Sequence, residues 1–378
     1  MNVCVLGWYG TETLGDRAIL EGIIKIFQNI ETKNHFYIGS LYPFFTERTV
    51  YEEKEALIGL GVEKRILIFD ETNGKKLREY IQKADIVIMG GGPLMDLLEI
   101  DIIDKAFIYA KKHKKKTGVI GCGIGPLKND YYRKSVYSIL VNSDVSIFRD
   151  KNSLAAAKML NHQFGNRITE KTLSYSNDPA IIPIASFQKT ESTLKNRIVV
   201  NLRDLSFQSS TEVQEQIKEN LLTMLKNMSQ QFDEVLLLPN HVFSIGGDDR
   251  QYYSELKMEL SDFSNIHVEH EPKSLFETFR IIAESQAAIG MRYHAIVFHT
   301  FLNGNNYILD YTEPKTGKIM SFLSSIDKKH FYKNRYYNLS HTNESFCFDL
   351  SQDIFCYEPS IYNNTIEHYV KKIKEVMK

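Results

Sequence analysis

Residues 286–304, QAAIGMRYHAIVFHTFLNG, show most clearly the strand-and-helix pattern of this chain. The apolar run that stops at Gly290 is typical of a short buried strand, and apolar residues then recur at helical spacing until an Asn-Gly pair. Arg292 and His294 therefore lie in a strand-to-helix turn, next to N–H groups that have no partner inside the helix. Such a turn favours anions, because these N–H groups and the positive end of the helix dipole point the same way.

Arg292 and His294 bring two kinds of chemistry to this turn. An arginine can hold a phosphate or a carboxylate through two parallel hydrogen bonds, and a histidine can transfer a proton near neutral pH. On this stretch alone, a surface arginine and a histidine packed near the core are an equally good interpretation. His241, which follows a Pro-Asn pair, is a weaker candidate, and we expect His299, within the predicted helix, to be packed.

The same alternation of apolar strands and helices extends through the whole chain. The strand-like runs are continuously apolar, which is typical of a parallel sheet covered by helices on both faces. The pattern pauses over residues 178–197, which contain two prolines, and then restarts. A chain of 378 residues is also too long for one ordinary core. We therefore expect an α/β fold of two Rossmann-like parallel-sheet domains facing a cleft, residues 1–185 and 195–350.

Individual elements follow from the same spacing. Helical periodicity predicts a helix over residues 16–30 and a single helix over residues 47–60. An apolar run predicts a strand over residues 117–120, ending at a Gly-Cys-Gly turn. The aromatic segment over residues 331–355 has no pattern that assigns it, whereas residues 360–378 contain an amphipathic terminal helix.

Composition and charge exclude several classes of protein. The net charge of −1 gives no overall field that would attract nucleic acid or an acidic membrane. The first residues lack the pattern of a signal peptide, and no run approaches the ~20 apolar residues of a membrane span. The four cysteines show neither CxxC spacing nor a cluster with histidines, so we expect a reducing compartment and no metal site. We expect a cytoplasmic protein.

A glycine-rich turn, GWYGTETLGD, follows the first predicted strand. Gly7, Gly10 and Gly15 would allow a ligand to approach the backbone closely, and Asp16 would cap the helix that follows. A tight turn with a helix cap is at least as good an interpretation. The turn does not follow the GxGxxG spacing, which gives a dinucleotide site little support.

A second loop, with Gly90, Gly91 and Gly92 followed by Asp96, is a stronger candidate for ligand contact. Three consecutive glycines cost folding entropy, which favours a need for close backbone approach or positive φ over a purely steric loop. Carboxyl ends of strands are also where open α/β sheets bind ligands. The same interpretation applies more weakly to the later turn that contains Gly123 and Gly125.

Basic residues follow other predicted strands. Arg149 and Arg203 each stand directly after a strand, and Lys315 comes a few residues beyond another. For Arg149 alone, an ion pair with Asp150 or a neighbour is the better interpretation, and Lys315 is equally well a loop lysine. The sequence contains no HExxH, Walker lysine or GxSxG element, which disfavours a zinc hydrolase, a P-loop NTPase and a serine hydrolase.

Taken together, these pieces resemble the polysaccharide pyruvyl transferase family. They occur in the order of the family between Gly7 and about Lys315. The matching pieces are Leu14-Gly15-Asp16, Gly90-Gly91-Gly92 with Asp96, the Gly-Ile-Gly-Pro turn at residues 123–126, Phe148-Arg149-Asp150 with Ser153, Leu202-Arg203, Gly290-Met291-Arg292-Tyr293-His294, and Tyr311 with Lys315. The chain departs from the family pattern at Thr13, where an asparagine is usual, and at Arg17, where an acidic residue is common.

The resemblance implies a GT-B-like fold, in which the terminal helix over residues 360–378 packs back on the N-terminal domain. It implies transfer of pyruvate from phosphoenolpyruvate to a saccharide as a ketal, in cell-surface polysaccharide biosynthesis. The C-terminal domain would be the donor side and the N-terminal glycine turns the acceptor side. In that chemistry the donor's charges are held by cations and its methylene is protonated by His294; the cations are Arg149, Arg203, Arg292 and Lys315.

The implied partners are phosphoenolpyruvate and a saccharide that is lipid-linked or nucleotide-activated. No metal or redox cofactor and no nucleic acid are expected, and peripheral contact with the inner face of the membrane stays open. Two other functions remain as alternatives. One is a GT-B glycosyltransferase that uses a nucleotide sugar, and the other is a non-catalytic saccharide- or anion-binding protein.

Overall fold

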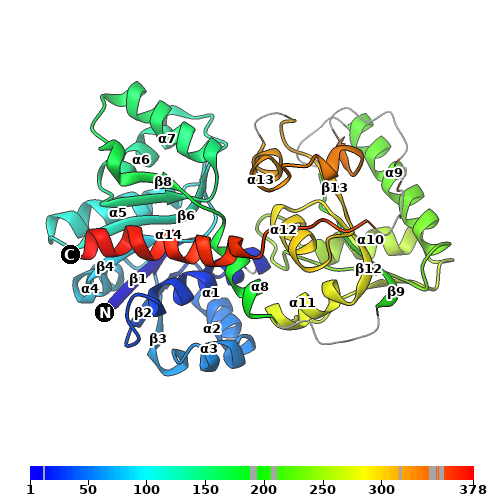
Figure 1. Cartoon of the computed structure of the whole chain (residues 1–378), viewed down its shortest axis with the longest axis horizontal. Coiled ribbons are helices and arrows are strands. Elements are labelled where there is room, and N and C mark those ends of the chain that lie inside the picture. The colour runs from blue at the N-terminus through cyan, green and yellow to red at the C-terminus, as the bar shows by residue number, and fades with distance from the viewer. Residues whose placement is uncertain are drawn as a thin grey trace. The chain divides into compact units, whose positions relative to one another are not determined.

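The computed structural model describes residues 1–11, 13–187, 194–205, 211–314, 317–339, 346, 348 and 353–378, with only the backbone of residues 211 and 212. The chain divides into two compact units (Figure 1). The first unit combines Met1–Ala185 with Pro359–Lys378, and the second is Ser186–Glu358.

The first unit is built on an eight-stranded parallel sheet. Its strands are β1 (Asn2–Leu6), β2 (His35–Ser40), β3 (Ile66–Asp70), β4 (Ile86–Met89), β5 (Pro93–Leu94), β6 (Lys116–Ile124), β7 (Val145–Phe148) and β8 (Leu173–Tyr175). The strand order is β3-β2-β1-β4-β6-β7-β8, and β5 pairs with β6. Central strands such as β4 are buried at every residue, as expected of a sheet covered on both faces.

Helices connect these strands. They are α1 (Leu14–Gln28), α2 (Pro43–Glu52), α3 (Lys54–Gly59), α4 (Gly74–Lys83), α5 (Ile100–Lys112), α6 (Asp130–Val141), α7 (Lys151–Phe164), α8 (Ile182–Ser186) and the terminal α14 (Ser360–Met377). Short 3₁₀ turns occur at Glu63–Arg65, Glu170–Thr172 and Pro179–Ile181. The terminal helix α14 belongs to the first unit (Figure 1). Its buried Tyr369 donates its hydroxyl to Asn177 O at 2.9 Å.

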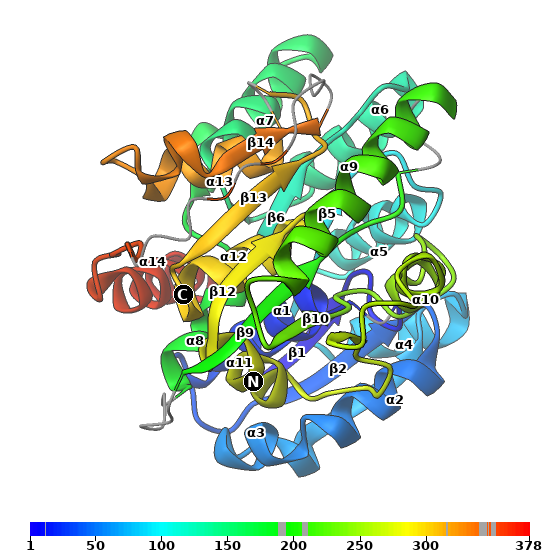
Figure 2. The same cartoon turned by 90° about the vertical axis from the view of Figure 1, so that its right-hand side faces the viewer.

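The second unit repeats the architecture with a six-stranded parallel sheet, ordered β11-β10-β9-β12-β13-β14. The strands are β9 (Lys195–Asn201), β10 (Glu234–Leu237), β11 (Ile266–Val268), β12 (Ser285–Gly290), β13 (Asn306–Asp310) and β14 (Tyr336–Asn338). The helices are α9 (Thr211–Ser229), α10 (Asp249–Glu259), α11 (Leu275–Ala283), α12 (Tyr293–Leu302) and α13 (Lys318–Ile326), with a 3₁₀ turn at Phe331–Asn334. Figure 2 shows β9, β12 and β13 side by side in this sheet.

The predicted fold of two parallel-sheet α/β domains is confirmed, and most elements lie within a few residues of their predicted positions. The single helix predicted over residues 47–60 is wrong. The structure has α2 and α3, which meet at Glu53, and Pro43 begins the first of them. Proline favours the first turn of a helix, where its missing N–H costs no hydrogen bond. The strands β8 and β14 were not predicted.

The strand predicted to end at residue 120 continues as β6 to Ile124. Gly121 interrupts its regular pairing with β7, because its φ of +71° is left-handed rather than extended. A Cβ at this position would also collide with the ring of Pro179. The glycines of this segment therefore lie inside the strand and allow a bulge, whereas the sequence had predicted a turn there.

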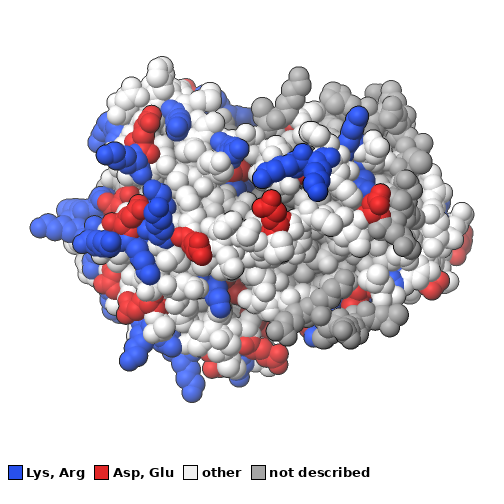
Figure 3. All heavy atoms as spheres, in the orientation of Figure 1, with Lys and Arg blue, Asp and Glu red and all other residues white. Residues whose placement is uncertain are grey.

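On the face shown in Figure 3, basic and acidic side chains are interspersed over the first unit. This mixture agrees with the net charge of −1 and gives no broad field of one sign on that face. Within the described ranges, the structure contains no helix that combines the length and apolar character needed to cross a membrane.

Candidate functional site

The carboxyl edge of the second unit's sheet brings together residues that follow neighbouring strands. Arg203 comes after β9, Arg292 after β12 and Tyr311 after β13, and these three strands are adjacent. Arg203 Nη1 donates to the Tyr311 hydroxyl at 2.9 Å. The Arg292 backbone N–H donates to Asn201 Oδ1 at 3.0 Å, which ties the end of β12 to that of β9. This edge is where parallel α/β sheets present side chains to ligands.

Arg292 is held by an ion pair that the sequence did not indicate. Its Nε donates to Asp249 Oδ1 at 2.8 Å, and its Nη2 donates to Asp249 Oδ1 at 2.6 Å and to Gly247 O at 3.1 Å. Only 1% of the Asp249 side chain is exposed, against 14% for Arg292. Burial alone would lower the pKa of Arg292, but the charge and hydrogen bonds of Asp249 outweigh burial and raise it. The guanidinium is therefore a fixed cation rather than a mobile surface charge.

Asp249 itself is fully engaged at the start of α10. Besides Arg292, its Oδ2 accepts hydrogen bonds from the backbone N–H groups of Asn240 at 2.9 Å and His241 at 3.0 Å. The Asp249 carboxylate thus holds the loop after β10 and also holds the Arg292 guanidinium, which follows β12. Removing either charge would leave the other one buried without its partner.

His294 lies in the first turn of α12, as predicted. Its ring is partly buried between Tyr293, with ring centroids 4.9 Å apart, and Phe298, at 6.3 Å in a stacked arrangement. Arg292 is the N-cap residue of this helix, and among the described residues no side chain caps it. The first-turn N–H groups and the positive end of the helix dipole are therefore at the same edge as His294.

Tyr311 is surrounded by cations. Besides the hydrogen bond from Arg203, the Arg203 Cζ lies 5.1 Å and the Lys318 Nζ 5.6 Å from the centroid of the Tyr311 ring. Lys318 begins α13 and was not singled out in the sequence. Lys315, which was predicted to bind the donor, lies outside the described residues. Lys318 therefore places a lysine beside Tyr311, three residues after Lys315 in the sequence.

A pocket of about 310 Å³ opens at this edge. Its lining combines two arginines, three aspartates and two glycines: Arg203, Asp204, Gly246, Gly247, Asp248, Asp249 and Arg292. A second pocket of about 400 Å³ shares Arg203 and Asp204 and is also lined by Lys218 and Tyr252. The first pocket is of the size that small-molecule ligands occupy in proteins.

The two other histidines named from the sequence are buried. His299 is 1% exposed, and burial lowers its pKa to about 3, so it is a neutral, packed residue as predicted. His241 is 5% exposed, and its Nε2 lies 2.7 Å from Ile245 O. Burial, and then the charge of Arg292, lower the pKa of His241. Neither has the partly exposed position of His294.

In the first unit, the two glycine loops pack against one another. The Tyr9 hydroxyl donates to Gly90 O, and Trp8 Nε1 donates to Pro93 O at 3.0 Å. At Gly92, φ is +66°, and a Cβ would collide with the Trp8 indole. Other atoms do lie close to the backbone of Gly91 and Gly92, as the sequence predicted, but these atoms belong to Trp8 and Tyr9. A role of Gly7, Gly90, Gly91 and Gly92 in binding the acceptor stays a prediction.

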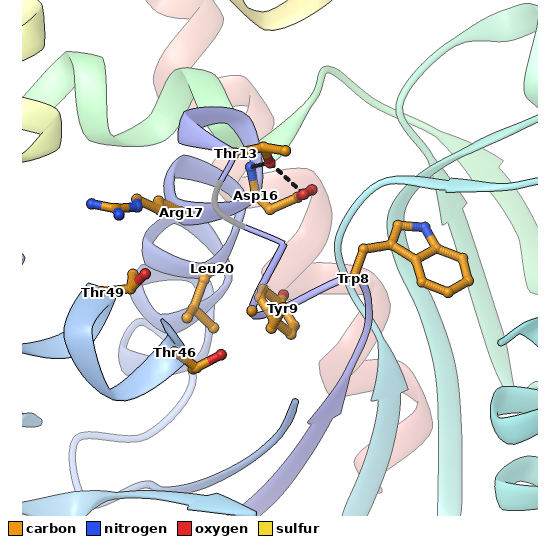
Figure 4. Close-up of a pocket in the computed structure, with 9 residues that line it drawn as sticks. Trp8, Tyr9, Thr13, Asp16, Arg17, Leu20, Thr46 and Thr49 are labelled. Atoms are coloured by element: carbon orange, nitrogen blue, oxygen red, sulfur yellow. Dashed lines mark hydrogen bonds between the residues drawn. The ribbon is translucent and has the colours of Figure 1, made fainter. Parts of the chain in front are cut away.

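The helix that follows the first strand begins earlier than predicted. Thr13 is the N-cap of α1, and its Oγ1 accepts from the Asp16 N–H at 3.1 Å. The Thr13 hydroxyl also donates to the Asp16 carboxylate (Figure 4). Asp16 therefore lies in the first turn and supports the cap rather than being the cap, and Gly15 lies within the helix.

Figure 4 shows the small pocket at this turn, lined by Trp8, Tyr9, Gly10, Thr13, Asp16, Arg17, Leu20, Thr46 and Thr49. Its volume of about 20 Å³ holds roughly one water molecule and no sugar ring. Arg17 is buried beside it and pairs through Nη1 with Glu52 Oε2 at 2.5 Å and Glu53 Oε1 at 3.5 Å. The unusual arginine thus links α1 to the junction of α2 and α3.

Asp96 joins the second glycine loop to the turn after β6. Its Oδ2 accepts from the backbone N–H groups of Lys128 at 2.9 Å and Asn129 at 3.2 Å. The Gly125 N–H donates to Leu94 O at 2.8 Å. In the described part of the chain, the buried Asp96 Oδ1 has no hydrogen-bond partner, so one carboxylate oxygen remains for another group.

Arg149 has the ion pair that the sequence left open as its alternative. It is 7% exposed, and its Nη1 lies 3.4 Å from Asp178 Oδ2 and its Nε 3.8 Å from Asp150 Oδ2. Its guanidinium also packs over Gly123, where a Cβ would come within 2.9 Å of Nε and Nη2. These contacts belong to the first unit, and donor binding by Arg149 stays a prediction. Among the described residues, no group of His, Cys, Asp and Glu could hold a metal ion.

The sequence of this chain matches the family model described as Polysaccharide pyruvyl transferase over residues 14–311, which is more than half of its length. The chain belongs to the polysaccharide pyruvyl transferase family. The match ends at Tyr311 and so includes Arg203, Arg292 and His294. It confirms the resemblance found in the sequence. No curated protein matches the chain.

This member of the polysaccharide pyruvyl transferase family is also similar to solved structures. The UDP-GlcNAc 2-epimerase from Methanocaldococcus jannaschii has a TM-score of 0.60 at 11% identity, covering 99% of this chain and 100% of its own. Its complex with UDP-GlcNAc and UDP has a TM-score of 0.53 at 12% identity, covering 100% and 93%. A glycosyltransferase from Rickettsia africae has a TM-score of 0.53 at 12% identity, covering 100% and 98%. These likenesses show a GT-B-like fold.

Proposed function

We propose that this chain transfers the pyruvyl group of phosphoenolpyruvate to a saccharide as a ketal, in the biosynthesis of cell-surface polysaccharide. One observation carries the proposal. Arg203, Arg292 and Lys318 gather around Tyr311 at the sheet edge where His294 lies in the first turn of α12. Phosphoenolpyruvate has a phosphate and a carboxylate next to a carbon that must be protonated, and this edge offers fixed cations and a histidine.

The donor's charges match the cations of the second unit. Arg292 is held by Asp249 on one side of its guanidinium, which leaves its Nη1 side for an anion at the pocket of about 310 Å³. Arg203 lines the same pocket. Guanidinium groups bind phosphate and carboxylate through paired, charge-assisted hydrogen bonds. We assign the phosphate and carboxylate of the donor to Arg203, Arg292, Lys318 and the N-terminus of α12.

His294 would act as the acid. Protonation of the donor's methylene gives a methyl group and an oxocarbenium-like carbon, which a saccharide hydroxyl then attacks. Phosphate leaves with the C–O bond electrons, and a second hydroxyl closes the ketal. Each step is a proton transfer or the making or breaking of a C–O bond, so we propose a reaction that needs no metal or redox cofactor.

We assign the saccharide to the first unit, at the loops after β1, β4 and β6. The pocket beside Thr13 is too small for a sugar, so the acceptor would lie over these loops. We propose a lipid-linked or nucleotide-activated saccharide, and reaction in the cytoplasm at the inner face of the membrane. The buried free thiols of Cys4 and Cys122 are compatible with that compartment.

A nucleotide-sugar glycosyltransferase is the second candidate. Support comes from the structural neighbours, one of which is solved with UDP-GlcNAc and UDP, and from the second pocket of about 400 Å³ beside Arg203. The family match favours pyruvyl transfer over this candidate. Calorimetric titration separates the two, because pyruvyl transfer requires binding of phosphoenolpyruvate in the absence of any nucleotide sugar.

The test is incubation of the full chain with phosphoenolpyruvate and a panel of saccharides, both lipid-linked and nucleotide-activated. Phosphate release and a pyruvyl mass gain in one saccharide are expected. Absence of both with every saccharide, together with transfer from a nucleotide sugar, would favour the glycosyltransferase. Tight phosphoenolpyruvate binding without turnover would favour a non-catalytic binding protein.

A further inference from the structure

Tyr311 is a phenol at the donor edge with an environment unlike that of the other buried tyrosines. The residue is partly buried at the end of β13, and its hydroxyl accepts a hydrogen bond from Arg203 Nη1 at 2.9 Å. The Lys318 Nζ lies 5.6 Å from its ring centroid. By contrast, Tyr253 donates its hydroxyl to Leu202 O at 3.0 Å, which stabilises a neutral phenol.

The charges that face Tyr311 come from three elements. Lys318 begins α13, Arg203 follows β9 and Arg292 precedes α12. Burial by itself would raise the pKa of Tyr311, but the charges of Lys318, Arg203 and Arg292 outweigh burial and lower it to about 8. The adjacent Asp310 carboxylate is turned to other partners, since it accepts from Thr312 N–H at 2.7 Å and from the Tyr336 hydroxyl at 2.8 Å. Ionisation of Tyr311 to the phenolate is thus easier than for an ordinary tyrosine.

We propose that Tyr311 is a catalytic base of the pyruvyl transfer, which takes the proton of the attacking hydroxyl and passes it to the departing phosphate. This role rests on the proposed function. The cations that hold the donor phosphate are the ones that surround the Tyr311 oxygen, so base and leaving group are side by side. After it has taken the proton of the attacking hydroxyl, the Tyr311 phenol can deliver that proton to the phosphate as it departs.

The protons balance with two groups. His294 gives one proton to the donor's methylene, and the first saccharide hydroxyl forms its C–O bond while its proton moves to the Tyr311 oxygen. The C–O bond to phosphate breaks, phosphate takes the electron pair, and the Tyr311 phenol returns the proton to that phosphate. The second hydroxyl closes the ketal and its proton restores His294. Both residues end in their starting states.

The experiment compares the full-length wild type with Tyr311→Phe and Tyr336→Phe. The first substitution keeps an aromatic ring for the cation–π contacts and removes only the hydroxyl. Tyr336 is a matched control, because its hydroxyl also lies in the second unit but donates to the Asp310 carboxylate instead of accepting from Arg203. Ultraviolet absorbance of tyrosinate is followed against pH, and kcat and the KM for phosphoenolpyruvate are measured with the saccharide found active.

A tyrosinate step near pH 8 is expected in the wild type and in Tyr336→Phe and is expected to disappear in Tyr311→Phe. Turnover by Tyr311→Phe should fall roughly 10²–10⁴-fold with little change in KM, and the remaining activity should lose the rise with pH through that range. Wild-type turnover with an unchanged kcat in Tyr311→Phe would overturn the base role and leave the proposed function standing. A wild type inactive with phosphoenolpyruvate would overturn both, even if the tyrosinate step were present.

Discussion

Replacement of Arg292 by alanine should lower both the stability of the protein and its affinity for phosphoenolpyruvate. The ion pair of Arg292 Nη2 with Asp249 Oδ1 is 2.6 Å long, and the Asp249 side chain is 1% exposed. Removing one partner of a buried pair costs about 3–5 kcal/mol. Because the N–H groups of Asn240 and His241 still donate to the carboxylate, we expect a loss at the lower end, about 3 kcal/mol.

This loss should lower the melting temperature by about 6–12 °C, given about 2–4 °C per kcal/mol for a unit of this size. The phosphoenolpyruvate affinity should fall roughly 10- to 150-fold, because a hydrogen bond to a charged group is worth about 1.5–3 kcal/mol. Thermal unfolding and calorimetric titration with phosphoenolpyruvate measure the two effects, with titration at a temperature where the variant is fully folded.

Arg250→Ala is the matched control. Arg250 Nη2 pairs with Asp248 Oδ2 at 2.7 Å, but the two side chains are 30% and 21% exposed, and Arg250 does not line the pocket. Such a partly exposed pair is worth about 0–1 kcal/mol, so little change is expected in stability or affinity. Equal melting temperatures for the two variants would refute the account of the buried pair. Unchanged donor affinity in Arg292→Ala would refute its donor role.

Two further predictions concern the acid and a buried carboxyl. His294→Ala should reduce turnover roughly 10²–10⁴-fold with donor affinity little changed, and near-wild-type kcat would remove His294 as the acid. Glu71 is 1% exposed, and burial raises its pKa to about 8, so the folded state binds its proton more tightly than the unfolded state. Stability should therefore fall as pH rises from about 4.5 to about 8, by up to about 5 kcal/mol. Denaturant unfolding of Glu71→Gln should show a weaker fall than wild type, whereas identical pH profiles would contradict the assignment.

Much of the fold was predictable because buried parallel strands are marked by continuous apolar runs. The apolar run predicted to stop at Gly290 is β12, which ends there, and the ends of β9, β12 and β13 indicated which residues reach the ligand edge. His294 and Arg292 followed from one strand-to-helix turn. Where the position of a residue depends only on the strand or helix that contains it, the local sequence pattern was enough to predict that position.

The partners of these residues depend on contacts between distant elements. Asp249 is 43 positions from Arg292, and only the pairing of β10 and β12 with β9 brings the two together. The glycines after β1 and β4 indicated that something approaches the backbone. Glycine cannot indicate whether that is a ligand or, as the structure has it, the rings of Trp8 and Tyr9. The cluster of cations around Tyr311 could not be predicted either, because Arg203, Arg292 and Lys318 come from separate elements.

In the proposed reaction, the bond broken in the donor is the one between its carbon and the bridging oxygen. Phosphoenolpyruvate with a heavy oxygen isotope at the bridging position tests this most directly, with the active saccharide as acceptor and mass spectrometry of both products. Pyruvyl transfer predicts that the label leaves with inorganic phosphate and that the saccharide gains an unlabelled pyruvyl group. Label retained in pyruvate, or a saccharide that gains phosphate, would contradict the account.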